Sequence, residues 1–292
     1  MEMMVSILVL LPVMGAAVSL FSVGANQHAS EQSSIDANQE ARTALEMMTT
    51  EIGQAGSHGD VYTTLASGIG NSTSEQPASV ASAAGITVGD FVTVDTGSAQ
   101  EIVEVTAVTS STFSGIFRAA HDAGDPVRLF ALPYRNGMLT PAGMAANSSN
   151  TVTTLRFYGD INSNATVQYV EYGYDSANNQ ITRSVTPITQ STRNPAIPFV
   201  RNLRPNSVQF TLNTDSRGIV TSARVSMTVQ NSVKSGKGTH AKLQETTLSS
   251  RISIPSAIAG SALLYELQRF GGVDRLPDTP PKVTEWANYE DQ

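Results

Sequence analysis

The residues from position 160 onward carry the oxygen-bearing side chains, and part of the spacing, of a calcium-binding loop. Such a loop binds Ca²⁺ through oxygens at its first, third, fifth and twelfth positions. Here these positions are Asp160, Asn162, Asn164 and Glu171. The sixth position, which needs Gly for a sharp turn, is Ala165, and the flanking segments alternate like strands. A hairpin turn rich in Asp and Asn is therefore favoured over this weak candidate for a metal site.

The histidines offer no spacing that suits a metal or a catalytic group. The chain has four of them, at His28, His58, His121 and His240. His121 stands beside Asp122 and close to Asp125, a grouping more typical of a turn than of a metal site. The chain contains no cysteine, no Gly-rich phosphate loop after a strand and no Gly-x-Ser-x-Gly motif. We therefore expect no metal, no cofactor and no enzymatic activity.

A single carboxylate stands ahead of a long apolar run at the N-terminus. Glu2 precedes residues 3–24, which have no charge and would form a helix of about 33 Å, enough to cross a bilayer. A carboxylate buried there costs at least about 2.5–3.5 kcal/mol unless it is paired, so Glu2 is a candidate functional residue. Pro12 and Gly15 lie inside the run, where neighbouring helices can satisfy backbone groups freed by a break. These three residues are the predicted assembly residues.

The apolar run continues into an amphipathic segment, residues 25–56. Its apolar residues fall on one helical face, at Ala41, Leu45, Met48, Ile52 and Ala55. Gly56 is a plausible stop. The first 55 or so residues thus predict one helix of roughly 80 Å. A single domain of this size cannot cover such a helix, so its first half needs lipid or other copies of the chain.

The remaining residues are predicted to be mainly strands. Residues 57–84 are rich in small polar residues and are interpreted as a linker. Residues 85–133 alternate with period two and predict a small inserted β-module, and residues 134–258 predict an antiparallel sheet. Residues 259–292 predict a short helix around 262–270 and an acidic, Pro-containing tail. Two alternatives stay open for this tail: it is disordered, or Trp286 and Tyr289 anchor it on a neighbour.

The N-terminal fifth of the chain resembles the type IV pilins, and most of all PilW-type minor pilins and J-type pseudopilins. The resemblance rests on Glu2 ahead of its apolar run, on Ala41–Met48 and on Glu51–Gly56. It implies an α+β, pilin-like fold: a long N-terminal helix, membrane-spanning and then amphipathic, packed on an antiparallel sheet. The small all-β module would be an insertion into that fold. The resemblance also implies N-terminal methylation, and a Glu2 that neutralises the N-terminal amine of an adjacent subunit.

We therefore expect a structural subunit, minor or major, of a type IV pilus-like surface filament. Its partners would be other pilin subunits, bound through the N-terminal helix, with the inner membrane holding the chain before assembly. A nucleic-acid partner is disfavoured because 25 acidic residues outnumber 18 basic ones. Two alternatives stay open: a pseudopilin of a type II secretion system, and a membrane-anchored periplasmic binding or enzymatic domain.

Overall fold

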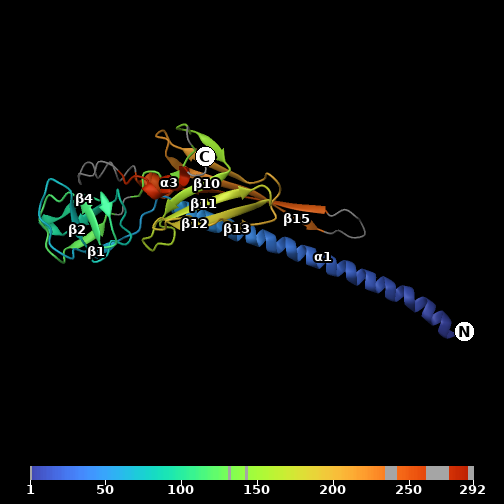
Figure 1. Ribbon diagram of the computed structural model, residues 1–292. Coiled ribbons are helices and arrows are strands. Elements are labelled where there is room, and N and C mark those ends of the chain that lie inside the picture. The colour runs from blue at the N-terminus through green and yellow to red at the C-terminus, as the bar shows by residue number, and fades with distance from the viewer. Residues whose placement is uncertain (1, 131–132, 142–143, 234–241, 261–275, 289–292) are drawn as a thin grey trace.

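One helix dominates the N-terminal part of the chain. The structure is a computed structural model that describes residues 2–130, 133–141, 144–233, 242–260 and 276–288. Helix α1 (Glu2–Gly53) runs without interruption through Pro12, as the sequence predicts. It projects away from the strands, so its N-terminus lies far from the rest of the molecule (Figure 1). Among the described residues, the helices contain no stretch that is both long and apolar enough to span a membrane.

The end of α1 is set by a close approach of three chain segments. Gly56 has a φ of +77°, a left-handed conformation that ends the helix and that Gly adopts at little cost. Its N–H donates to the carbonyl of Tyr158 at 2.7 Å, and its carbonyl accepts from the N–H of Tyr134 at 3.0 Å. A Cβ on Gly137 would collide with the Gly56 backbone. The predicted stop at Gly56 is therefore confirmed, and it also joins α1 to the strands.

Two antiparallel sheets and the C-terminal half of α1 enclose the main core. The strands of the first sheet, in spatial order, are β13 (Ile197–Val200), β12 (Gln180–Pro187), β11 (Gln168–Asp175), β10 (Thr154–Gly159) and β8 (Met138–Leu139). Those of the second are β16 (Lys242–Ser253), β15 (Val220–Val233), β14 (Gln209–Thr214) and β9 (Ser149–Val152). Helix α1 contacts β13, β15 and β16. The buried faces of both sheets and the buried stripe of α1 belong to one hydrophobic cluster.

A smaller β-module with its own core lies at the end of the molecule away from the N-terminus (Figure 1). Its first sheet has the order β1 (Tyr62–Thr64), β7 (Pro126–Leu129), β3 (Phe91–Val94) and β4 (Glu101–Glu104). Its second sheet has the order β2 (Gln76–Ser79), β6 (Thr112–Gly115) and β5 (Ala107–Val108). A 3-10 turn, η1 (Gly97–Ala99), separates β3 from β4. We call residues 62–130 the small module.

The expected α+β, pilin-like fold is wrong. Strands account for 36% of the structure and helices for 24%, and the described residues form four antiparallel sheets with only one long helix. The arrangement fits α+β only loosely and is not a clear pilin fold. The physical reason is that period-two alternation predicts strands but not their partners. The strands expected in one sheet divide between two, and the small module adds two more.

Two local expectations also change. The segment interpreted as a linker, 57–84, contributes β1 and β2, which pair with β7 and β6. Short polar strands of this kind gain their partners from distant residues, so the local sequence does not reveal them. Near the C-terminus, α3 (Pro281–Asn288) buries Trp286 against Tyr169, with ring centroids 5.6 Å apart. The short helix expected around residues 262–270 lies outside the described residues.

Candidate functional site

The first half of α1 exposes large apolar side chains. The described ones with more than half of their surface exposed are Leu10, Val13, Met14, Val18, Leu20 and Phe21. At 100° per residue these six lie within about 160° of the helix circumference. The small residues Gly15, Ala16 and Ser19 lie with Pro12 on the opposite side. Between Leu10 and Phe21, α1 therefore has a bulky apolar face and, around Gly15, a face on which another backbone can approach closely.

The second half of α1 is docked on the sheets. Ala41, Ala44, Met48 and Ile52 are buried in the main core, and Leu45 packs against it. This agrees with the apolar stripe expected from the sequence. The docked part begins near Ser34, which is 5% exposed and whose Oγ donates to Gln244 Oε1 of β16 at 3.2 Å.

A buried ion pair fixes the last turn of α1 to the first sheet. The carboxylate of Glu51 accepts hydrogen bonds from Tyr172 Oη of β11 and from the guanidinium of Arg183 of β12. Glu51 is 7% exposed. Burial, followed by the negative charge of Glu51, raises the pKa of the Tyr172 phenol above its usual range. The ion pair thus fixes the rotation of α1 about its own axis, and the apolar first half of the helix points away from the sheets.

Each predicted assembly residue lies in the projecting half of α1. Glu2 is the first residue of the helix. Pro12 is exposed and does not interrupt the helix. No atom outside its own helix backbone lies within 4 Å of a Cβ built on Gly15. Among the described residues, none covers the small face around Gly15, so this face is open to a neighbouring molecule.

The candidate calcium ligands do not come together. The carboxylate of Asp160 accepts the backbone N–H groups of Asn164 at 3.0 Å and Ala165 at 2.8 Å, so it holds its own turn. Asn162 is exposed. Ala165 adopts a φ of +61°, the conformation for which the loop would prefer Gly.

Glu171 has a different environment from the other three. It lies in β11 opposite Arg156 of β10, about 10 Å along the strand from the turn by the rise per residue. Its Oε1 accepts from Arg156 Nε at 3.1 Å and from Tyr169 Oη at 2.7 Å, and Arg193 Nη1 contacts both of its oxygens. The carboxylate is therefore engaged in an ion-pair network in the sheet.

Two histidines lie in buried polar clusters. His58 Nε2 lies 2.9 Å from Asp90 Oδ1, and the ring stacks on Tyr134 with centroids 5.0 Å apart. These residues join the end of α1 and the segment before β8 to the small module. Burial, followed by the charge of Asp90, raises the pKa of Tyr134 above its usual range. His28 is exposed on α1, and His240 lies outside the described residues.

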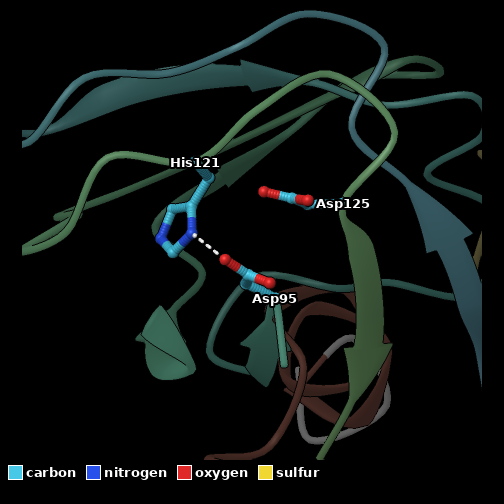
Figure 2. A group of neighbouring side chains, drawn as sticks. All are labelled: Asp95, His121 and Asp125. Carbon is cyan, nitrogen blue, oxygen red and sulfur yellow. Dashed lines mark hydrogen bonds and ion pairs between the residues drawn. The ribbon is translucent and has the colours of Figure 1, made fainter. Parts of the chain in front are cut away.

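The second cluster surrounds His121 and is the one group of possible metal ligands found among the described residues (Figure 2). It contains Asp95, His121 and Asp125, and Glu101 contacts the other side of the imidazole. The spacing along the chain groups His121 with Asp122 and Asp125 as a turn and does not reveal Asp95 and Glu101. These two precede His121 by 26 and 20 residues. Only the pairing of β3 with β4 and β7 brings them to it.

Comparisons with known proteins give no match. No family model matches the chain, and no curated protein and no solved structure matches it.

Proposed function

We propose that the chain is a structural subunit of a type IV pilus-like surface filament, assembled through the first half of α1. The observation that carries this proposal is the exposure of the six large apolar side chains between Leu10 and Phe21. An apolar patch left uncovered on a folded chain marks a contact with other molecules. Other copies of the same helix are the partners of matching length and chemistry.

The energetics favour several neighbours over one. In water, covering a large apolar side chain contributes about 1.5–3 kcal/mol, hence about 9–18 kcal/mol for the six together. In a membrane the lipid already covers these side chains, so assembly there gains only the packing contacts between helices. Ordering one subunit against another costs about 4–15 kcal/mol. Even the gain from water is similar to this cost, and the gain from lipid is smaller, so contact with a single copy is weak. Contacts all around α1, with bulky faces meeting small faces, are needed for a stable assembly, and a helical filament provides them.

Glu2 has a specific part in this proposal. Its carboxylate would lie among apolar helices in the filament and would pair with the N-terminal amine of an adjacent subunit. Two buried charges that pair are much less costly than one left alone. Before assembly, the inner membrane would cover the apolar run. The sheets and the small module, held at the opposite end of α1, would then face outward.

The decisive experiment replaces Glu2 and follows incorporation into filaments. The Glu2→Ala variant should be made and retained in the membrane fraction, but it should be strongly depleted from sheared surface filaments measured by mass spectrometry. Glu31→Ala is the matched control, because Glu31 is exposed on the same helix beyond the apolar run. Wild-type amounts of the Glu2 variant in filaments would contradict the assembly role and leave α1 as an anchor. Recovery of the wild-type chain only from the cell envelope would favour a pseudopilin.

A further inference from the structure

His121 is a buried imidazole surrounded by carboxylates from three segments of the small module. Its side chain has no exposed surface. Asp95 follows β3, Glu101 begins β4, and Asp125 immediately precedes β7. The ligand atoms of Asp95, His121 and Asp125 all lie within 4.8 Å of one another. Figure 2 shows both aspartates turned toward the imidazole.

Glu101 orients the imidazole. Its Oε1 lies 2.7 Å from His121 Nε2, and its two oxygens also accept the N–H groups of Arg118 at 2.8 Å and Ala119 at 3.2 Å. An ionised carboxylate only accepts hydrogen bonds, so Nε2 carries the proton that faces it. The other ring nitrogen, Nδ1, then faces the aspartates. Metal-binding histidines usually have this arrangement, with the ring N–H donated to a carboxylate and the second nitrogen on the metal.

The spacing around Nδ1 suits ligands of one ion better than a direct hydrogen bond. Asp95 Oδ2 is 3.4 Å from Nδ1, longer than the usual N–H···O distance of about 2.9 Å. Two ligands each about 2.1 Å from a tetrahedral metal lie about 3.4 Å apart. Each aspartate uses one oxygen to hold its own turn: Asp95 Oδ1 accepts from Thr96 N–H, and Asp125 Oδ2 from Asp122 N–H. The second oxygen of each remains for a ligand.

The charge of the cluster also calls for a cation. Three acidic side chains surround one imidazole, so the acidic groups of the cluster outnumber its one basic group. Among the ion pairs between described residues, none joins a Lys or Arg to Asp95, Glu101 or Asp125. Asp95 and Glu101 are largely buried, with 18% and 13% of their side chains exposed. Excess negative charge in such a place is costly unless a counter-ion is bound.

We propose that Asp95, His121 and Asp125 bind a first-row divalent transition-metal ion such as Zn²⁺ or Mn²⁺, with Glu101 as a positioning residue. A nitrogen ligand favours these ions over Ca²⁺ and Mg²⁺, which prefer oxygen alone. The ion would connect the turn after β3 with the loop before β7. The β3–β7 pairing and the hydrogen bond from the Asp95 N–H to the Pro126 carbonyl already hold these segments together, so the ion would add a link between their side chains. This inference is independent of the proposed filament, and it revises the turn interpretation of His121.

The test is metal titration of the full chain, purified in detergent without a histidine tag and freed of metal by chelation. Isothermal titration should show one saturable site for Zn²⁺ or Mn²⁺, and the bound ion should raise the melting temperature of the protein. Asp125→Asn should lower the affinity at least 100-fold. Asp122→Asn is the matched control, since this exposed aspartate lies in the same loop and undergoes the same change of charge.

Two further variants test the roles of the other groups. Glu101→Gln should lower the affinity 10- to 100-fold, the range for a residue that orients a metal-binding histidine. His121→Gln should abolish the absorption bands that Co²⁺ shows when an imidazole nitrogen binds it; if this variant does not fold, Asp125→Asn decides alone. No saturable binding of Zn²⁺ or Mn²⁺ would overturn the proposal. So would binding of Ca²⁺ only, or equal affinities in the Asp125 and Asp122 variants.

Discussion

The two halves of α1 are both apolar enough to be buried, yet only one is. From Leu10 to Ser33 the described side chains are exposed, apart from the partly covered Val23. From Ser34 onward one side of the helix packs in the main core, and Glu51 is paired beneath it. The more apolar half is thus the uncovered one. Burial depends on what lies opposite a side chain as well as on its hydropathy, and the proposed function assigns the uncovered apolar half a partner outside the chain.

A matched pair of methionines tests this difference most directly. Met48 is fully buried, whereas Met14 is 59% exposed on the same helix. Met48→Ala should lower the free energy of unfolding by about 2–5 kcal/mol, because it removes packed methylenes and leaves a cavity. Met14→Ala should leave that stability unchanged and reduce incorporation into filaments. The measurements are denaturant unfolding in detergent and filament yield. Equal destabilisation by both variants would show that the first half of α1 is covered within the subunit.

Removal of one partner of the buried ion pair should have the next largest effect. Arg183→Met leaves the carboxylate of Glu51 without its cation and should cost about 3 kcal/mol of stability. Arg204→Met is the control, because the pair of Arg204 with Glu245 is exposed and contributes at most about 1 kcal/mol. Amide exchange in the last turns of α1 should rise in the first variant only. Similar exchange in both would mean that Glu51 does not hold the helix on the sheet.

Alkaline pH should have the smallest effect on stability. It should act through the buried tyrosines of β10, β11 and the segment before β8. Burial is the largest cause of the raised pKa of Tyr134, Tyr158, Tyr169 and Tyr172. A phenol whose pKa is higher in the folded state stabilises the fold at pH values below its unfolded-state pKa, which is near 10. This stability is lost as the pH rises above that pKa. The loss at pH 10 is about 0.4 kcal/mol for each such tyrosine.

The check is a titration of tyrosinate absorbance alongside unfolding curves at several pH values. These four phenols should ionise only as the protein unfolds. Ionisation of all eight tyrosines of the chain before any loss of structure would contradict the burial of the four.

The residues of α1 show how far local patterns reach. The helix, its stop near Gly56 and its buried stripe all follow from spacing along a single segment, so they were predictable. The division of strands into four sheets was not, because alternation reports which face of a strand is buried and is silent about its neighbour. The same limit explains β1 and β2, whose partners lie more than 30 residues away along the chain.

The two candidate metal sites show the same division between what the local sequence determines and what the tertiary structure decides. The sequence by itself determined that Asp160 would hold a turn, because its partners are the backbone N–H groups four and five residues ahead. Only the tertiary structure decided that Glu171 would face arginines and that His121 would meet Asp95 and Glu101. Hydrogen bonds within a turn depend on neighbouring residues, whereas ligand sets assembled across strands depend on how the whole sheet closes.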